Sequence, residues 1–481
     1  MTVRLRFAPS PTGNLHLGTL RAALFNWLYA QKKKGVFLCR IEDTDLQRSE
    51  ARFEDSIFEG LAWLGLTCDE SPMVGGDFGP YRQSERRGIY QTYIDQLIES
   101  GYAYYCFATP EDLEAEREEA KKAKKPYVYS GKYRDYFLDE AKQRVQAGEK
   151  AVLRFKMPQS GTVTVHDLIR GEVTFDYALI GDFILQKSDG TPAFNFAVVV
   201  DDALMNITHV IRGEDHLSNM PRQLAVFEAL GFEPPQFAHL PMILGADKSK
   251  LSKRHGATNV IEYKEQGFLP EAMLNYLALL GWTPFGGHEK LPLQDLIQAF
   301  DIDQVNSSGA VFDVKKLSWL NGQYIRDLSA TDFQHRVVPF IATTVMNKLK
   351  DLYNDLQLQQ IMGLAQASIT FLTEMEDFLQ VFIEEDRAYQ QRLNALGFKP
   401  EEQAFLSLFT QKVTGLDAAF SAQDMKVILE EIVAETGLGK GKVFRPIRIA
   451  MTGFQSGPDL MQVLALLGKG CLLRRLGMLI G

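Results

Sequence analysis

Two short stretches, far apart in the chain, carry residue types that handle phosphate groups. In His16-Leu17-Gly18-Thr19, the imidazole can hydrogen-bond a phosphate oxygen, and the glycine leaves bare backbone against which a flat purine can lie. In Lys250-Leu251-Ser252-Lys253-Arg254, the two lysines stand three residues apart, so one loop could direct both ammonium groups at departing phosphates. Taken singly, the first could be a helix-capping histidine and the second a solvated basic loop. Together they predict a nucleotide site.

The residues around the first stretch predict a strand, a tight loop and a helix. Apolar and polar residues alternate over 3–7, which is the period of a half-buried strand. Two prolines and a glycine within 9–13 end that strand. Apolar residues then recur at helical spacing over 17–28, with Asn14 as the predicted N-cap. The N-terminus of such a helix would offer free N–H donors and a partial positive charge to a phosphate.

A second strand is predicted at 36–41, because this run is short, apolar and rich in β-formers. It runs into Glu42-Asp43-Thr44-Asp45, and carboxylates at the carboxyl end of a parallel strand lie where open α/β sheets bind ligands. Glu42 leaves the strand first and is the candidate ligand residue. The alternative is an N-cap cluster for the helix predicted over 50–64. A further helix is predicted over 85–100.

The pattern changes between 101 and about 184, where short β-prone pieces flank a charged helix, which indicates an inserted α+β module. Sheet-like runs then resume and lead to a last strand before the lysine loop, and from 317 onward the chain has helical spacing. The predicted pieces of the insertion are 152–157 and 163–175, and the predicted resumed strands are 183–186, 196–200, 207–211 and 239–244.

Composition is typical of a globular protein, with 46% hydrophobic and 23% charged residues among 481, enough for about three domains. No basic start leads into an apolar run, so no signal peptide is predicted. Lys469, Arg474 and Arg475 interrupt the apolar tail, which argues against a membrane span. The four cysteines are far apart, which favours a reducing cytoplasm over a disulfide framework.

The net charge of −9 is unevenly distributed. Residues 121–134 contain six Lys or Arg and no acid, and 438–481 contain seven basic residues against Asp459 alone. Residues 351–386 contain eight acids and no Lys or Arg. Each run could be a solvated face, but the C-terminal basic excess is the kind of local stripe that binds RNA.

The two phosphate stretches together resemble the signature motifs of class I aminoacyl-tRNA synthetases. Further blocks resemble the glutamyl-tRNA synthetases, and the resemblance covers nearly the whole chain: RFAPSPTG at 6–13, RIEDTD at 40–45, NFAVVVDD at 195–202, ITHVIRGEDH at 207–216, VFDVKKLSWLNGQYI at 311–325 and GKGKVFRPIRIAMTG at 439–453. It implies a Rossmann-like α/β sheet with an inserted α+β module, followed by an all-α anticodon-binding region. The implied domains are 1–100 and 184–235 (catalytic), 101–183 (acceptor-binding insertion), 236–316 (stem contact, with the lysine loop) and 317–481 (anticodon-binding, divisible into 317–375 and 376–481).

The resemblance implies ATP-dependent attachment of L-glutamate to tRNA(Glu) through a glutamyl-adenylate, with Mg²⁺ accompanying ATP. Catalysis is expected from His16, Gly18, Lys250 and Lys253. ATP binding is expected from these four together with Thr12, Thr19, Leu251, Ser252 and Arg254. Glutamate binding is expected from Arg6 and Arg212 as carboxylate partners, Glu42 and Ser10 as ammonium partners, and Ala8, Phe194 and His216.

This chain departs from the family at three places. Phe194 stands where the family usually has tyrosine, so one hydrogen bond of about 1 kcal/mol is missing. Ala108, Tyr133 and Asp135 replace the partners of Cys106 in the zinc site of some members, and one thiolate cannot build such a site, so no zinc is expected. Enzymes that accept only tRNA(Glu) are thought to read the third anticodon base with an arginine. The matching region 363–372 has none, which predicts that tRNA(Gln) is also charged.

The residues of this tRNA-discriminating region are Gly363, Gln366 and Ser368, and the alternative is that Arg445 or Arg448 reads the base instead. Rival activities are a glutaminyl-tRNA synthetase, a tRNA-modifying paralogue, a small-molecule adenylyltransferase and a non-catalytic RNA-binding protein. The long helical C-terminal region disfavours the first three, and the two intact motifs disfavour the last. We expect a cytoplasmic monomer with no membrane partner.

Overall fold

The structure is a computed structural model that describes residues 2–45, 48–383, 389 and 400–480. The chain divides into two compact units: Met1–Lys264 with Met273–Asp313, and Glu265–Ala272 with Val314–Gly481. The finer domain division expected from the sequence stays a prediction. Among the described residues, no helix is long and apolar enough to cross a membrane.

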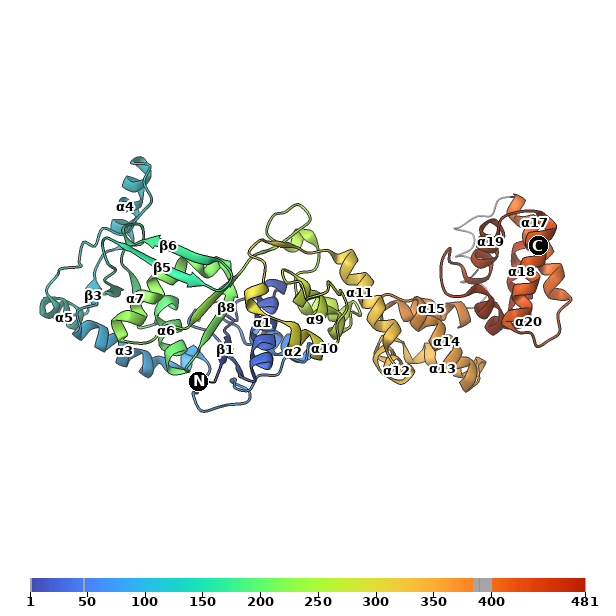
Figure 1. The fold of residues 1–481 in the computed structure, drawn as a ribbon, viewed down its shortest axis with the longest axis horizontal. Helices are drawn as coiled ribbons and strands as arrows, with labels where there is room; N and C mark the ends of the chain where they lie inside the picture. Colours follow the sequence, from blue (N-terminus) through green and yellow to red (C-terminus); the bar gives the residue numbers. More distant parts are fainter. Residues whose placement is uncertain (1, 46–47, 384–388, 390–399, 481) are drawn as a thin grey trace. The chain divides into compact units, whose positions relative to one another are not determined.

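The first unit contains all the strands of the described chain, together with the helices of the N-terminal half (Figure 1). The strands are β1 (Arg4–Phe7), β2 (Val36–Cys39), β3 (Ala103–Cys106), β4 (Val152–Phe155), β5 (Thr162–Asp167), β6 (Gly171–Asp176), β7 (Phe183–Gln186), β8 (His209–Gly213), β9 (Gln236–Leu240), β10 (Ile243–Leu244) and β11 (Ala310–Val311). The helices are α1 (Leu17–Lys33), α2 (Ala51–Trp63), α3 (Arg87–Glu99), α4 (Pro110–Lys122), α5 (Leu138–Gln146), α6 (Phe194–Leu204), α7 (Met220–Leu230) and α10 (Leu293–Ala299). Most of α8 (Val260–Glu265) and of α9 (Pro270–Leu279) also belongs to this unit, but α8 ends and α9 begins within the segment Glu265–Ala272 of the second unit.

The central sheet has six strands in the order β2-β1-β8-β9-β5-β6. Strands β2, β1, β8, β9 and β5 pair in parallel, and β6 closes the edge as an antiparallel hairpin with β5. The predicted strand, loop and helix at the N-terminus are confirmed, and so are the second strand beside the first and the helix at 51–63. The carboxyl ends of β1, β2 and β8 therefore share one edge of the sheet, where an open α/β sheet binds its ligands.

The predicted cap of α1 is wrong by two residues. The N-cap is His16 rather than Asn14: its backbone is extended (φ −83°, ψ 148°) and its side chain accepts a hydrogen bond from Gly18 N–H. Helix α1 therefore begins at Leu17, and the imidazole takes over the capping role that the sequence had assigned to the amide of Asn14.

Three predictions about the later strands are also wrong. The run 196–200 lies in helix α6. Its residues are buried on all sides, and an apolar run without periodicity does not show whether it forms a strand or a buried helix. The run 183–186 (β7) pairs with β4 in a separate three-stranded sheet, whereas 163–175 provides β5 and β6 of the central sheet. The single strand expected at 239–244 is two strands, because Pro241 has no N–H to donate to a ladder.

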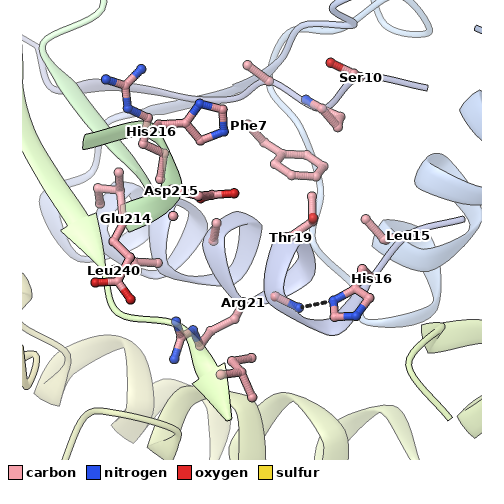
Figure 2. A pocket seen from close by; sticks show the side chains of 18 of the residues that line it. Phe7, Ser10, Leu15, His16, Thr19, Arg21, Glu214, Asp215, His216 and Leu240 are labelled. Atoms are coloured by element: carbon pink, nitrogen blue, oxygen red, sulfur yellow. Dashed lines mark hydrogen bonds between the residues drawn. The ribbon is translucent and has the colours of Figure 1, made fainter. Parts of the chain in front are cut away.

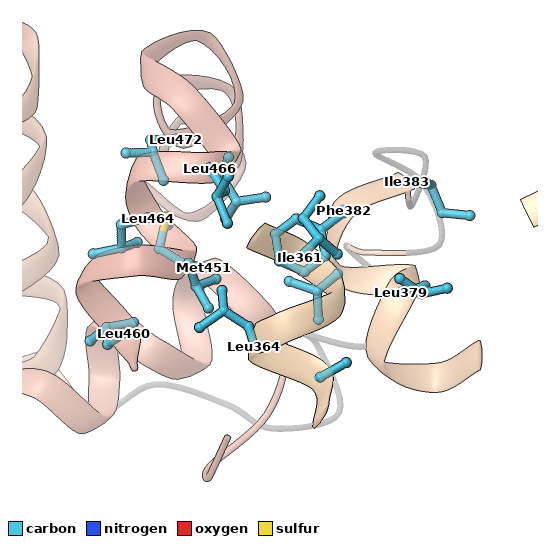
Figure 3. Close-up of a cluster of buried hydrophobic side chains, with 14 of the residues drawn as sticks. Ile361, Leu364, Leu379, Phe382, Ile383, Met451, Leu460, Leu464, Leu466 and Leu472 are labelled. Atoms are coloured by element: carbon cyan, nitrogen blue, oxygen red, sulfur yellow. The ribbon is translucent and has the colours of Figure 1, made fainter. Parts of the chain in front are cut away.

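The second unit is helical, as predicted: α11 (Val314–Asp327), α12 (Ala330–Val337), α13 (Thr343–Leu352), α14 (Asp355–Ser368), α15 (Glu374–Ile383), α17 (Pro400–Thr414), α18 (Ala422–Thr436), α19 (Lys440–Thr452) and α20 (Leu460–Ile480). Figure 3 shows side chains of α14, α15, α19 and α20 in its buried core. The glycine-rich stretch 437–441 follows helix α18 and not a strand, so it lacks the strand–loop–helix context of a dinucleotide-binding loop.

A buried ionic cluster lies behind the edge of the central sheet. Arg40 is fully buried, and its guanidinium contacts Asp202 at 2.8 Å and Asp201 at 3.6 Å. Asp201 also accepts hydrogen bonds from Arg86 Nε at 2.7 Å and from Tyr90 Oη at 2.8 Å. Such charges remain ionised in the interior only while each keeps its partner. The cluster therefore holds α3, α6 and β2 together.

Replacing Asp201 with asparagine removes one charge from this cluster and keeps the shape of the side chain. We expect Asp201→Asn to destabilise the first unit by roughly 3–5 kcal/mol, because two buried arginines lose their shared anion. Urea unfolding followed by tryptophan fluorescence measures this loss. The matched control, Asp189→Asn on an exposed turn, should change the stability by less than about 0.5 kcal/mol. Equal stability of the two variants would contradict the account.

Candidate functional site

A cavity of about 460 Å³ opens at the carboxyl edge of the central sheet, between the ends of β1, β8 and β9 and the N-terminus of α1 (Figure 2). Twelve of the residues predicted from the sequence line it: Arg6, Ala8, Ser10, His16, Gly18, Thr19, Glu42, Phe194, Arg212, His216, Lys250 and Leu251. Thr12, Ser252 and Arg254 are not among the lining residues. The side chain of Lys253 lies outside the described residues.

Sequence reasoning missed several lining residues. Glu214 and Asp215 follow Arg212 at the end of β8, so the rule that selected Glu42 after β2 could have found them. Arg21 of α1 had no signal of its own, because a lone arginine in an apolar helix face usually indicates the solvent side. Figure 2 shows Arg21 on the same wall as Glu214 and Leu240.

His16 both caps α1 and faces the cavity. Its Nδ1 accepts the hydrogen bond from Gly18 N–H at 3.1 Å, so in the neutral ring the proton is on Nε2. Burial, followed by the charge of Lys250, lowers the pKa of His16, which keeps the ring neutral at pH 7. The N–H of Leu17 is already bonded to Thr258 O at 3.0 Å. The cap thus fixes an imidazole that can donate from Nε2, while fewer helix N–H groups are free than the sequence suggested.

The lysine loop is closed by its own acidic residue. Asp247 contacts Arg254 Nη2 at 3.0 Å and His255 Nε2 at 3.2 Å, and it accepts a hydrogen bond from Ser249 N–H at 2.9 Å. Arg254 is therefore committed to the loop itself. Lys250 is exposed and lines the cavity, and its charge acts on His16, so it is the described lysine of the motif with access to a bound anion.

Charged side chains from β1, from the segment after β2 and from helix α6 form ion pairs beside the cavity. Arg6 of β1 donates to Asp202 at 3.2 Å, and Glu42 after β2 contacts Arg40 at 3.0 Å. Burial raises the pKa of Glu42, against the opposing influence of Arg40 and Arg6. Burial also acts on Asp202, but there the two arginines prevail and the pKa is lowered. These groups are neutralised within the cluster before any ligand enters.

Arg212 of β8 differs from its neighbours because its charge is not neutralised. It is 7% exposed, its Nε donates to His239 Nε2 at 3.0 Å, and its Nη2 donates to Gln223 Oε1 at 2.8 Å. No carboxylate lies within ion-pair distance of its guanidinium in the described part of the chain. Burial and the nearby Arg6 lower its pKa to about 9, so it is still a cation at pH 7. Of its five N–H groups, two are used, and the cavity holds a buried cation without an anion.

Phe194 and His216 form an aromatic wall beside Arg212. Their ring centroids are 5.5 Å apart and the rings are tilted by 41°. Burial and the charge of Arg212 lower the pKa of His216 to about 4, so this ring is neutral at pH 7. The wall is therefore uncharged, and the cationic character of the cavity comes from arginine and lysine.

No group of three or more His, Cys, Asp or Glu side chains is arranged to hold a metal ion in residues 2–45, 48–383, 389 and 400–480. The thiol of Cys106 instead lies 3.2 Å from Tyr129 Oη and 3.3 Å from Arg154 Nε, inside a small apolar cluster. The absence of zinc remains an expectation from the sequence.

Comparisons with known proteins agree over the whole chain. Residues 2–319 match the family described as tRNA synthetases class I (E and Q), catalytic domain, and residues 332–480 match an anticodon binding domain. The glutamate–tRNA ligase of Carboxydothermus hydrogenoformans is 44% identical over 98% of this chain and 99% of its own. The ligase of Sulfurihydrogenibium sp. is 46% identical over 97% and 96%. A crystal structure of the glutamate–tRNA ligase of Elizabethkingia meningosepticum in complex with its amino acid has a TM-score of 0.85 at 34% identity, covering 100% of this chain and 99% of its own.

Proposed function

Because this chain belongs to the glutamate–tRNA ligases of the class I aminoacyl-tRNA synthetases, we propose that the cavity of its first unit is where glutamate and ATP react. The enzyme attaches glutamate to tRNA(Glu), with ATP as a substrate. The predicted α/β catalytic fold with a helical anticodon-binding region is likewise confirmed. The roles of individual residues, given below, are our proposals.

The observation that carries the proposal is the unpaired cation Arg212. Glutamate brings two carboxylates and an ammonium, and a dry cavity with an unneutralised guanidinium favours a carboxylate over an uncharged ligand. Arg212 would take one carboxylate and Arg6, on the neighbouring strand, would share it. Glu42 and Ser10 would hold the ammonium, while Ala8, Phe194 and His216 would form the walls.

We assign the ATP phosphates to the other end of the cavity. Adenylation joins a carboxylate to the α-phosphate and expels pyrophosphate, so the protein must position the groups in line and stabilise negative charge on the transferring phosphorus. The Nε2 donor of His16 and the ammonium of Lys250 can do so from opposite sides. Gly18 and Thr19 would admit the nucleotide to the start of α1, and Leu251 would contact it from the loop.

The remaining expectations stay proposals. Ser252 and Arg254 would contribute after the lysine loop moves, since neither lines the cavity. Thr12, which is also not a lining residue, and Lys253, whose side chain lies outside the described residues, keep their expected roles in ATP binding as proposals. Mg²⁺ would enter with ATP and be held mainly by phosphate oxygens and water. We also propose a cytoplasmic monomer and the five-part domain division given above.

Arg212→Ala should weaken binding of a non-hydrolysable glutamyl-adenylate analogue by about 100-fold or more, because a carboxylate then loses its charged partner in a buried site. Isothermal titration calorimetry measures the affinity directly. The control Arg222→Ala removes an arginine of α7 that does not line the cavity and should bind within about threefold of the parent. An affinity of Arg212→Ala within threefold of the parent would rule out the carboxylate role.

Two substitutions of His16 separate its capping role from its phosphate role. Asparagine can accept the Gly18 N–H but cannot reach a phosphate, whereas alanine can do neither. We expect both His16→Asn and His16→Ala to slow ATP–pyrophosphate exchange with glutamate, assayed with and without tRNA, by roughly 100-fold or more. Near-normal exchange in His16→Asn alone would show that the histidine is only a cap.

We further propose that the enzyme also glutamylates tRNA(Gln). Gly363 and Ser368 line a second cavity, of about 760 Å³, in the second unit, and none of its lining residues is Lys or Arg. Gln366 is committed elsewhere, because its amide donates to Ile325 O at 3.0 Å and to Leu328 O at 2.7 Å. The nearest alternative reader is Arg448, whose guanidinium lies beside the lining residue Gly457. An arginine fork provides about 1–3 kcal/mol of base discrimination. Its absence would reduce the preference for tRNA(Glu) over tRNA(Gln) by about 10- to 100-fold.

Charging assays on purified tRNA(Glu) and tRNA(Gln) test this proposal. We expect the ratio of kcat/KM for the two tRNAs to stay below about a hundredfold in the parent and to widen in Gly363→Arg, where the added side chain meets open space. Arg448→Ala is the control, and it should leave the ratio unchanged. A parent preference for tRNA(Glu) beyond about a thousandfold, or a loss of preference in Arg448→Ala, would overturn the proposal.

A further inference from the structure

Behind Arg212 stands a chain of two buried polar side chains that do not line the cavity. His239, on β9, accepts from Arg212 Nε at 3.0 Å, and its Nδ1 lies 2.6 Å from Asp167 Oδ2. Asp167 ends β5, and both side chains are inaccessible to solvent. Neither belongs to a motif quoted from the sequence, so the chain Asp167–His239–Arg212 is visible only in the fold.

The protonation state of this chain follows from its geometry. A guanidinium can only donate, so His239 Nε2 must be the acceptor, and the single ring proton must be on Nδ1, where it is donated to Asp167. Burial lowers the pKa of His239, which keeps the ring neutral. Burial opposes ionisation of Asp167, but its hydrogen bonds from His239 and from backbone N–H groups prevail and lower its pKa. A carboxylate thus fixes the tautomer that Arg212 requires.

A second support fixes the other side of the guanidinium. Gln223 Oε1 accepts from Arg212 Nη2, and the amide of Gln223 is oriented by donating to Asn195 Oδ1 at 3.0 Å. The guanidinium is planar, so two fixed contacts determine its plane. The remaining N–H groups then present a rigid fork to the cavity, and rigidity of this kind reduces the cost of ordering a side chain when a ligand binds.

The β5–β6 hairpin supports the cavity at one more point. Arg170, three residues after Asp167, forms an ion pair with Glu214, which lines the cavity and also accepts from Met242 N–H at 2.7 Å. The turn itself is held by Asp167 Oδ1, which accepts the N–H groups of Ile169 at 3.0 Å and Arg170 at 2.9 Å. The β5–β6 hairpin therefore supports two side chains: Arg212 of β8, through His239, and Glu214, which follows β8.

We propose that Asp167 and His239 are positioning residues for the substrate carboxylate, acting through the orientation of Arg212. The inference deepens the proposed function, because it rests on Arg212 binding that carboxylate. Asp167 selects the Nδ1–H tautomer of His239, and His239 Nε2 holds the guanidinium in the plane that meets the ligand. Binding of ATP, at the other end of the cavity, does not depend on Asp167 and His239.

Asp167→Asn reverses the direction of the hydrogen bond between residue 167 and His239, with little change in the shape of the side chain. The asparagine oxygen can still accept the turn N–H groups, but its NH₂ now faces His239 Nδ1. The ring then takes the Nε2–H tautomer and presents a donor to the donor on Arg212. In ATP–pyrophosphate exchange with tRNA(Glu) present, we expect the KM for glutamate to rise about 10- to 100-fold, while the KM for ATP stays within about threefold.

One independent readout and one matched control accompany the kinetics. In ¹⁵N-histidine-labelled enzyme, the His239 resonances, assigned by their loss in His239→Gln, should switch from the Nδ1–H to the Nε2–H pattern in Asp167→Asn. The matched control is Asp182→Asn: this buried acid accepts from Tyr104 Oη at 2.8 Å and from Met157 N–H at 2.8 Å and has no contact with Arg212. It should leave the KM for glutamate within about threefold of the parent.

The His239 isosteres keep the test decisive if Asp167→Asn fails to fold. His239→Gln carries an oxygen near the Nε2 position and should retain glutamate KM within about fivefold, whereas His239→Asn cannot reach Arg212 and should raise it at least tenfold. Unchanged glutamate KM in Asp167→Asn, or parallel losses for glutamate and ATP in every variant, would overturn the proposal. If Arg212→Ala also binds the adenylate analogue normally, the failure belongs to the proposed function and not to the positioning chain.

Discussion

The buried guanidinium of Arg212 is the constraint on which this site depends. A cation at 7% exposure with no carboxylate in ion-pair distance, among the residues that the structure describes, is costly unless a ligand neutralises it. The fold offsets part of this cost, because His239 of β9 and Gln223 of α7 accept hydrogen bonds from the guanidinium. The remaining hydrogen-bonding capacity suits an anionic ligand, which we propose is a carboxylate of glutamate.

The buried ion pairs of the first unit explain why Arg212 has no acidic partner of its own. Arg6, Arg40 and Arg86 each contact Asp201 or Asp202 of α6. That helix places its two consecutive acids where they neutralise arginines from β1, β2 and the turn before α3. Arg212 enters from β8 on the cavity side and is not within ion-pair distance of either acid. The same cluster thus stabilises the sheet and leaves the positive charge of Arg212 for substrate.

The sequence indicated the residues that line the cavity better than it indicated the strands around them. Motif residues such as His16 and Lys250 were found because their types match phosphate chemistry and their neighbours have clear periods. The run 196–200, which lies in the helix at 194–204, was predicted as a strand because a run buried on all sides loses its period. The pairing of β5 with β9 could not be predicted either. The two segments lie about seventy residues apart, and the sequence of one strand does not specify which strand pairs with it. For the same reason Asp167 and His239 escaped notice.

A crystal structure of the enzyme with a non-hydrolysable glutamyl-adenylate analogue tests the central claim most directly. The account predicts a carboxylate of the glutamyl group within hydrogen-bond distance of the Arg212 guanidinium, roughly 2.7–3.0 Å, with His239 still accepting from Nε. The phosphate would lie toward His16 and Lys250. A glutamyl carboxylate bound away from Arg212, with that guanidinium turned toward a protein acid instead, would contradict the account.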